Sequence, residues 1–483
     1  MKRPIAIGLG VAFLCSCTTV GPDYRRPGNA LIASTTAAGA FVGADNAAFV
    51  TTPPPGNWWQ LYQDPMLDGL IQQALSANTD LRIASASIAR AEANLDLAKD
   101  QRYPSTNLEV SPSYTRLSPQ EQLLPDVDIP PLNLYSLGAS LSYQVDLFGQ
   151  IRRAIEASQA DLGATRAAYD AVRITVVADT TRAYVTACSA GHEITIAQQS
   201  VALQARSSAL TERRFAAGRG ISLDVTRAKA LEDRVSASIP PLEAARRTAL
   251  YRLAVLTGRP PAEFSRTVEK CVQDPRLNQP IPIGDGRALL ARRPDVRRAE
   301  YVLHAATAQV GVATADLYPK ISLGIGVESI GPDSTFLQYS ALKYSIGSLI
   351  TWQFPNRRIA KARIRGAQAT ADAAFGQFDG VVLAALRETE SALFIYGRDL
   401  DQRNYLEASR HEAATAASDA ERLFRLGGQD YLTVLDANLS LISADQALAA
   451  LDSKISADQI NLFMALGGGW ETAGSNEAEQ HKP

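Results

Sequence analysis

Two stretches of the chain, residues 103–148 and 318–354, alternate apolar and small polar residues, and this alternation limits the possible folds more than any other feature. In the first stretch, apolar residues occupy most even positions from 106 to 114 and most odd positions from 135 to 147. The second stretch repeats the pattern over residues 321–328 and 344–354. A period of two over about ten residues predicts β-strands that each have one apolar and one polar face.

Aromatic residues mark the ends of these predicted strands. One rim would carry Tyr103, Tyr143, Tyr318 and Trp352, and the other Tyr114, Tyr135 and Tyr344. Rings at two levels with aliphatic residues between them are typical of a lipid-facing surface. A soluble β-sandwich, whose apolar face would cover an ordinary core, is the alternative. In a membrane barrel the polar face would line the lumen, and we expect that lining to include Asn107, Glu109, Ser140, Gln144, Glu328 and Gln353.

The N-terminus has the pattern of an export signal. Lys2 and Arg3 precede a short apolar segment, residues 5–14, and the sequence Leu-Cys-Ser-Cys follows at residues 14–17. This arrangement resembles a bacterial lipobox and predicts a signal peptide over residues 1–16, with Cys17 as the lipidated first residue of the mature protein. An ordinary signal peptide that happens to contain cysteines is the alternative. Residues 17–57 are then expected to form a lipidated, extended tether.

Composition and motif spacing exclude several classes of function. The net charge of −2 offers no basic surplus for nucleic acid. The four histidines are widely separated, and no nucleophile or Walker motif is present, so we expect neither an enzyme nor a metal site nor a cofactor other than the lipid. Beyond the signal peptide no apolar run reaches the roughly 18 residues of a spanning helix. Contact with the membrane must therefore come from strands or lipid.

The two alternating stretches belong to two internal repeats. Tyr103-Pro104 recurs as Tyr318-Pro319, 215 positions later, each time after a helical pattern. The first repeat is expected over residues 58–258, with a helix from Trp58 to Leu75, strands at about 104–115 and 134–148, and long helices at 150–217 and 221–257. The second is expected over residues 287–469, with strands at about 319–329 and 343–354 and helices at 357–426 and 429–466. Residues 259–286 would form a connector or equatorial region, and residues 470–483 a flexible tail.

The long helices carry coiled-coil spacing. Residues 382, 386, 389, 393, 396 and 400 are separated alternately by four and three positions, which predicts antiparallel supercoiled packing and a core role. Cys188 and Cys271 remain in the mature chain, and the sequence leaves open whether they pair. Cys188 alone has the character of a small buried helix residue.

The number of strands predicts an oligomer. Each chain supplies four strands, and open strand edges are not tolerated in the hydrocarbon region because their backbone groups find no water there. Two chains would form a plugged eight-stranded barrel, whereas three would form twelve strands around a lumen. We therefore expect an α+β membrane protein: a trimeric 12-stranded β-barrel, with four strands per chain, continued by a long antiparallel α-helical coiled-coil barrel.

Several motifs resemble those of the TolC-type outer-membrane efflux family, specifically its lipoprotein branch, which serves resistance–nodulation–division (RND) pumps. They are Cys17 with Val20-Gly21-Pro22-Asp23-Tyr24-Arg25-Arg26-Pro27, then Trp58-Trp59, Asp64-Pro65, and the segments 78–82, 292–300, 317–319 and 427–437. The resemblance covers nearly all of the mature chain. It implies a homotrimer that sits in outer-membrane lipid, extends into the periplasm, and docks a periplasmic adaptor protein and an inner-membrane RND transporter.

The same resemblance points to a gate at the periplasmic tip. Leu432 and Asp436 match the apolar ring and the Asp ring that close the family's pore, where three leucines would block water and three carboxylates would attract cations. From the residues alone, a solvated carboxylate beside a turn is the favoured explanation of Asp436. Arg219 and Asp224, in the turn after Gly218, are candidates for a latch or adaptor contact, as is the turn at Gly427.

The leading functional hypothesis is a passive outer-membrane exit channel through which an efflux system passes small toxic compounds. A channel for secreted polypeptides is an alternative in the same architectural class. A soluble periplasmic coiled-coil lipoprotein acting as a scaffold is the alternative from another class.

Overall fold

The computed structural model describes residues 19–118, 120, 126, 128–273, 275–277, 279–352, 354 and 357–468. The predicted signal peptide, Cys17, Gln353 and the C-terminal tail lie outside the described residues. The chain forms two compact units. Unit 1 combines residues 1–27, 87–165 and 298–378, and unit 2 combines residues 28–86, 166–297 and 379–483.

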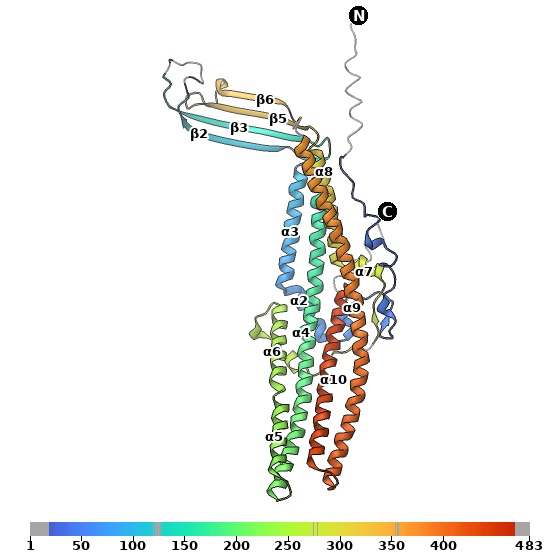
Figure 1. Ribbon diagram of the computed structural model, residues 1–483. Coiled ribbons are helices and arrows are strands. Elements are labelled where there is room, and N and C mark those ends of the chain that lie inside the picture. Colours follow the sequence, from blue (N-terminus) through green and yellow to red (C-terminus); the bar gives the residue numbers. More distant parts are fainter. Residues whose placement is uncertain are drawn as a thin grey trace. The chain divides into compact units, whose positions relative to one another are not determined.

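Unit 1 contains one four-stranded antiparallel sheet. Its strands are β2 (Ser105–Thr115), β3 (Leu132–Val145), β5 (Lys320–Pro332) and β6 (Leu342–Thr351), in the order β2-β3-β5-β6 (Figure 1). The central pair, β3 and β5, joins the two repeats through twelve register partners from Leu134–Pro332 to Val145–Ile321. The two outer strands, β2 and β6, are each paired on one side only.

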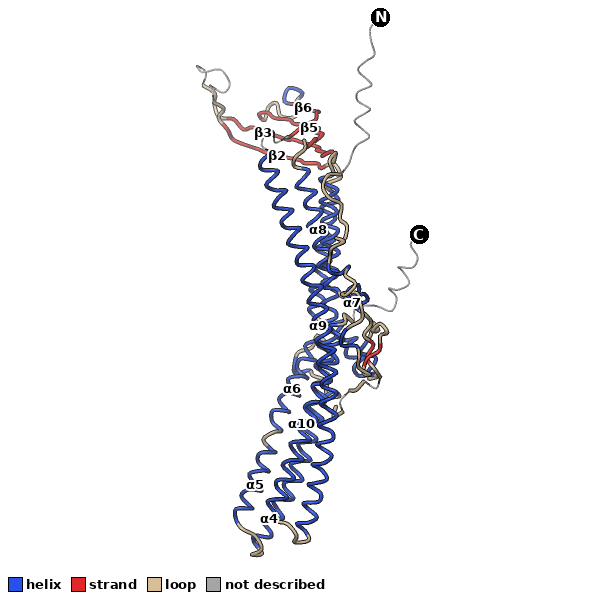
Figure 2. Tube along the Cα trace, turned by 45° about the vertical axis from the view of Figure 1, so that its right-hand side comes forward, coloured by secondary structure: helices blue, strands red, loops and turns tan. Residues whose placement is uncertain are grey.

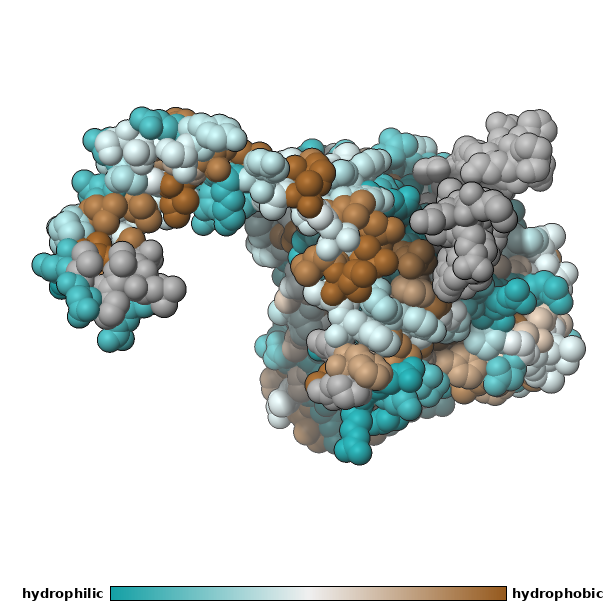
Figure 3. Space-filling view, turned by 90° about the horizontal axis from the view of Figure 1, so that it is seen from above, coloured by the Kyte–Doolittle hydropathy of each residue, from teal (hydrophilic) through white to brown (hydrophobic). Residues whose placement is uncertain are grey.

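The two faces of this sheet differ as the alternation predicts. Residues of the apolar face are exposed in the single chain: the exposed fraction is 71% for Leu108 and 77% for Ile346. In Figure 3, apolar residues (brown) gather along one side of the sheet, and neutral to hydrophilic residues (white to teal) lie along the other. A soluble sandwich would bury the apolar face, so the structure favours a sheet that meets lipid or another chain.

Unit 2 is built largely from long helices. α4 (Gln150–Ala216) and α9 (Arg357–Arg425) begin in unit 1, and the remaining long helices are α5 (Ser222–Ser236), α6 (Ile239–Leu256) and α10 (Tyr431–Ala465). Figures 1 and 2 show α4 beside α5 and α9 beside α10, as two antiparallel hairpins. α4 has no break, which gives it a length of about 100 Å at about 1.5 Å per residue. Among the described helices, none is both long enough and apolar enough to cross a bilayer.

The coiled-coil stripe of α9 lies in the core, as its spacing predicts. Val382 and Thr389 have no exposed surface, and Leu393 is 1% exposed. Tyr396 is also buried, and Leu386 and Leu400 are partly buried. The stripe therefore stabilises the helix packing.

The helix expected from Trp58 to Leu75 is divided in the structure. A 3-10 helix, η3 (Trp58–Tyr62), ends at Gln63, whose φ of 52° lies in the left-handed region. Asp64 then begins α2 (Pro65–Ala77), because its carboxylate accepts hydrogen bonds from the backbone N–H groups of Met66 and Leu67 at 2.9 and 3.3 Å.

Three further helices complete the two repeats. These are α3 (Thr79–Asp100), α7 (Gly286–Arg292) and α8 (Pro294–Ala315). α3 and α8 precede the first strand of each repeat and occupy equivalent places in it.

The segment expected as an extended tether is instead folded into unit 2 from residue 28 onward. It contains η1 (Leu31–Ala33), η2 (Val42–Ala44) and β1 (Phe49–Val50). β1 pairs in parallel with β4 (Ile281–Pro282), and Phe41 and Phe49 enter the main hydrophobic core of the unit. The difference arises because these apolar residues find a surface formed by chain more than 200 positions away.

The equatorial region is joined covalently to α4. Cys188 and Cys271 form a disulfide with their Cα atoms 4.8 Å apart and 83 positions apart in sequence. Nearby, Gly191 allows a close approach rather than a bend, since a Cβ there would lie 2.2 Å from the Cys271 carbonyl oxygen. The equatorial region also holds η4 (Pro261–Glu263) and η5 (Val268–Lys270). The remaining 3-10 helix, η6 (Tyr339–Ala341), belongs to unit 1 and lies just before β6.

Candidate functional site

The register of the sheet brings the described lumen residues, Asn107, Glu109, Ser140, Gln144 and Glu328, onto one face. Asn107 is the partner of Ser140, and Glu109 is the partner of Gly138, which in turn lies opposite Glu328. On the same face, the Gln144 amide donates to the Gln150 side-chain oxygen at 3.4 Å. These residues form a hydrophilic surface that could line a water-filled passage.

The predicted gate residues lie on the first turns of α10. Asp430 begins this helix, accepting hydrogen bonds from the N–H and hydroxyl of Thr433 at 3.0 and 2.7 Å, and these bonds lower the pKa of Asp430. Leu432 and Asp436 are both exposed and are four positions apart, so they lie one above the other on one face of the helix. The single chain thus presents both side chains for contact with water or another subunit.

Glycine turns end the first long helix of each hairpin. Gly218 has a φ of 67° and Gly427 a φ of 79°, and a Cβ would meet nothing within 4 Å at either position. Glycine is therefore favoured here by backbone conformation and not by space. Among the described residues, the side chains of Arg219 and Asp224 make no hydrogen bond or ion pair, so the single chain supplies no latch through them.

Two contacts between the hairpins were not anticipated from the sequence. The Arg214 guanidinium lies over the Phe424 ring, 4.2 Å from its centroid, and the hydroxyls of Ser207 and Tyr431 are 2.6 Å apart. Both contacts join α4 to the α9–α10 hairpin. Aromatic residues on each side of Gly427-Gly428 were the available signal, but the partners on α4 are more than 200 positions away.

In unit 1, the segment 19–27 is clamped onto α4 and α8. The Val20 N–H donates to the Phe148 carbonyl at 3.1 Å. Arg153 is 4% exposed, and its guanidinium donates to the carbonyls of Val20 and Gly21 at 3.2 and 3.3 Å and to Asp23 at 2.6 Å. Gly21 has a φ of 86°, and a Cβ there would lie 2.4 Å from the Gly311 Cα.

The clamp continues along α8. The Tyr24 ring stacks on His304 with centroids 4.3 Å apart, and its hydroxyl donates to Glu300 at 3.3 Å. Burial and the Glu300 carboxylate raise the pKa of Tyr24 to about 12, so the hydroxyl remains a donor. Arg26 donates twice to Glu300, at 2.8 and 2.7 Å. The Val20–Pro27 motif therefore has a structural role that its sequence does not disclose.

In unit 2, Arg293 connects the start of α8 to α9 and α10. Its guanidinium donates to Asp295 at 2.7 Å, to Glu388 at 2.8 Å and to the Ala465 carbonyl at 2.9 Å. Burial alone would lower the pKa of Arg293, but the two carboxylates outweigh it and the pKa is raised. The Arg293-Pro-Asp motif thus forms a fixed ion-pair network.

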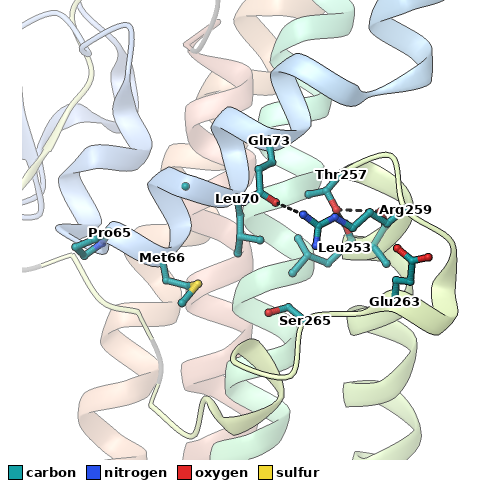
Figure 4. A pocket seen from close by; sticks show the side chains of 11 residues that line it. Pro65, Met66, Leu70, Gln73, Leu253, Thr257, Arg259, Glu263 and Ser265 are labelled. Carbon is teal, nitrogen blue, oxygen red and sulfur yellow. Dashed lines mark hydrogen bonds between the residues drawn. The ribbon is translucent and has the colours of Figure 1, made fainter.

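A pocket of about 320 Å³ lies between α2, α6 and the chain that follows α6. Figure 4 shows Leu70 and Leu253 on its apolar side and Arg259 with Glu263 at its polar end. The Arg259 guanidinium donates to the Gln73 side-chain oxygen at 3.5 Å. Within the residues that the structure describes, no group of three or more His, Cys, Asp or Glu side chains could hold a metal ion.

Comparison with known proteins identifies this arrangement of strands and helical hairpins. The family model described as "Outer membrane efflux protein" matches residues 70–259 and 286–468, more than half of the chain. The chain belongs to the outer membrane efflux protein family. Members of this family are outer-membrane channels and not enzymes, which confirms the efflux interpretation and the expected location in the outer membrane.

Relatives of this efflux protein cover almost its whole length. The toluene efflux pump outer membrane protein TtgC of Pseudomonas putida is 28% identical over 97% of this chain and 96% of its own. The probable outer membrane lipoprotein SilC of Salmonella typhimurium is 26% identical over 95% of this chain and 97% of its own. The solved outer-membrane channel OprN is 34% identical, with a TM-score of 0.84 over 93% of this chain and 99% of its own.

Proposed function

We propose that three copies of this efflux protein close a 12-stranded β-barrel in the outer membrane and continue it as an α-helical tunnel. The observation that carries the proposal is the four-stranded sheet, which has an exposed apolar face and two unpaired edges. β2 and β6 run in opposite directions, so the β6 edge of one copy can pair in antiparallel with the β2 edge of the next. Such closure supplies partners for all edge N–H and C=O groups in the hydrocarbon region.

The tunnel carries small toxic compounds outward, driven by an inner-membrane RND transporter and coupled to it by a periplasmic adaptor. The relative TtgC is named for a toluene efflux pump, which supports a small-molecule cargo over a secreted polypeptide. The chain itself has no nucleotide-binding motif, so the energy comes from a partner.

The gate of this tunnel lies at the tips of the hairpins. Leu432 and Asp436, exposed on one face of α10, form an apolar ring and a carboxylate ring when three copies meet. The contacts of Arg214 with Phe424 and of Ser207 with Tyr431 hold the hairpins of each chain together and favour the closed arrangement.

A lipid on Cys17 anchors the same part of the molecule that holds the sheet. Cys17 is two residues before Thr19, so at most about 7 Å of chain separates them. The Val20 N–H in turn donates to the carbonyl of Phe148, three residues after the end of β3. SilC, a relative, is described as a probable lipoprotein, which supports this modification.

Purified protein in planar lipid bilayers tests the proposal. We expect discrete, long-lived conductance steps from a heat-modifiable trimer, and a higher single-channel conductance with weaker block by multivalent cations for Asp436→Ala. Asp430→Asn is the matched control, because Asp430 faces its own helix N-terminus. A protein that gives no conductance, and that lipase treatment alone releases from outer membranes, would contradict the proposed barrel.

A further inference from the structure

One row of charged residues crosses the polar face of the sheet. The register aligns Glu109 on β2 with Gly138 on β3, Gly138 with Glu328 on β5, and Glu328 with Lys343 on β6. The row therefore reads Glu, Gly, Glu, Lys from one edge of the sheet to the other. All four positions line a hollow of about 260 Å³ on this face.

The rest of the polar face is nearly free of charge. Its other positions within the four strands carry Ser, Thr, Asn, Gln, Gly, Pro or aliphatic residues, with the exception of Lys320 at the first position of β5. Lys320 is already paired with Asp316 at 3.1 Å. A solute that moves along this face would thus meet fixed, unneutralised charge mainly at one row.

The three charges of the row are not equivalent. Lys343 Nζ lies 3.4 Å from the Glu328 carboxylate, which also accepts a hydrogen bond from the Ser136 hydroxyl at 3.3 Å. Glu109 is exposed and has no ion-pair partner among the described residues. Lys343 therefore offsets Glu328, and Glu109 carries the net negative charge of the row.

We propose that this row sets the charge preference of the β-barrel segment, with Glu109 attracting cations and Lys343 limiting the attraction by neutralising Glu328. The inference rests on the proposed trimeric barrel, in which the polar face lines the lumen. Each chain contributes a net charge of −1 from two Glu and one Lys, so three copies contribute −3. Because barrel strands are tilted, the row forms a slanted band rather than a flat ring.

A band of this kind acts on solutes through the local potential. Charged side chains that line a pore raise the concentration of ions of the opposite sign, by a factor that grows with the potential. Cationic amphiphiles would therefore be accepted over anionic ones at this level of the lumen. The preference should weaken with salt, because the Debye length falls from about 30 Å at 0.01 M to about 10 Å at 0.1 M.

A cysteine reporter beside the row measures this potential directly. Asn107 lies on the same face two residues from Glu109, about 7 Å along the strand. Cys188 and Cys271 are joined in a disulfide and do not compete for reagent. The experiment labels Asn107→Cys protein in outer-membrane vesicles with a cationic (trimethylammonioethyl) and an anionic (sulfonatoethyl) methanethiosulfonate at low salt. The labelling rate with the cationic reagent is divided by the rate with the anionic reagent. This ratio is then normalised to the same ratio measured for a free thiol.

The row predicts changes of opposite sign in this normalised ratio. We expect Glu109→Gln and Glu328→Gln each to lower it, and Lys343→Gln to raise it, each by about threefold or more, given potentials of about one to several kT. Glu109→Asp, which keeps the charge, is the matched control and should leave the ratio unchanged. Because the reporter senses only its surroundings, the state of the helical tip does not affect the result.

The labelling experiment distinguishes failure of the charge-row inference from failure of the proposed barrel orientation. If Asn107→Cys is labelled but the ratio in all three charge-removing variants equals that of the unaltered row, the inference is overturned while the lumen assignment stands. If Asn107→Cys is protected and Leu108→Cys, on the opposite face, is labelled instead, the proposed barrel orientation is wrong and the inference fails with it.

Discussion

Single side chains at the hairpin tips hold the two hairpins of each chain together. The hydroxyls of Ser207 and Tyr431 are 2.6 Å apart, and Arg214 lies over Phe424. A neutral hydrogen bond contributes about 1 kcal/mol and a cation–π contact at an exposed site about 0.5–1 kcal/mol. In the proposed tunnel, each contact would therefore be weak enough to break on opening and strong enough to bias the closed form.

Removing the Tyr431 hydroxyl should favour the open tip. Tyr431→Phe keeps the ring beside Phe424, 5.4 Å away, but deletes the bond to Ser207. With about 1 kcal/mol lost, we expect the open probability of single channels to rise by roughly fivefold. Tyr405→Phe, at a position 78% exposed on α9, is the control and should leave gating unchanged. Equal gating in the two variants would show that this contact does not restrain the tip.

Asp458 on α10 should make stability depend on pH. Burial raises the pKa of its carboxyl, the neighbouring Asp399 raises it further, and Lys454, 3.4 Å away, opposes the shift. A raised folded-state pKa means that the folded protein binds more protons than the unfolded chain between the two pKa values. Stability from this group is then lost as pH rises through the folded pKa.

We therefore expect Asp458→Asn to raise the thermal midpoint at pH 7 and to lose this advantage as pH falls and the native carboxyl becomes protonated. Thermal unfolding of the detergent-solubilised protein between pH 4 and 8 measures how the difference in midpoint between variant and wild type changes with pH. Asp419→Asn removes an exposed pair with Arg422 at 2.8 Å and should change little at any of these pH values. A lower midpoint for Asp458→Asn at pH 7 would contradict the assignment.

Among the elements, the equatorial segment between α6 and α7 depends on a covalent link. Its described residues form only short 3-10 helices and the two-residue strand β4, so few backbone hydrogen bonds of regular structure hold them. The Cys188–Cys271 disulfide closes a loop of 83 positions onto the buried part of α4. In the chain-entropy model a loop of this length contributes about 4.5 kcal/mol, by restricting the unfolded chain.

Reduction should release this segment before the long helices unfold. We expect dithiothreitol to expose new protease sites within residues 259–286 of the wild-type protein, detected by mass spectrometry of limited digests. The double variant Cys188→Ala with Cys271→Ala should show these sites without reductant and be insensitive to it. Identical digests of reduced and oxidised wild-type protein would show that packing alone secures the segment.

For the whole molecule, the central question is which face of the sheet meets lipid. Ser345 and Ile346 are neighbours on β6 and point to opposite faces. Arginine at the midplane of a lipid-facing strand costs about 2–4 kcal/mol, and a trimer contains three copies. We expect Ile346→Arg to abolish heat-modifiable trimers in outer-membrane fractions and Ser345→Arg to retain them. The reverse result would assign the apolar face to the interior of the assembly.

Much of the fold could be predicted from the sequence because its signals are local. The two-residue period located all four strands to within a few positions, and the long helix expected over residues 150–217 corresponds to the unbroken α4. The turns at Gly218 and Gly427 followed from the same local chemistry, since glycine adopts a positive φ without strain. The spacing of the α9 stripe likewise identified its buried side.

Other features were decided only by the tertiary structure, because they join residues that are distant in sequence. Pairing of β3 with β5, the Cys188–Cys271 bond and the clamp on residues 19–27 each depend on where far-separated segments meet. The ion pair of Lys343 was also decided by the tertiary structure. The sequence shows the charge of Lys343, but only the register of β5 and β6 places it beside Glu328. A periodic pattern specifies the face on which a side chain lies, whereas its partner across the sheet is specified only when the whole chain has folded.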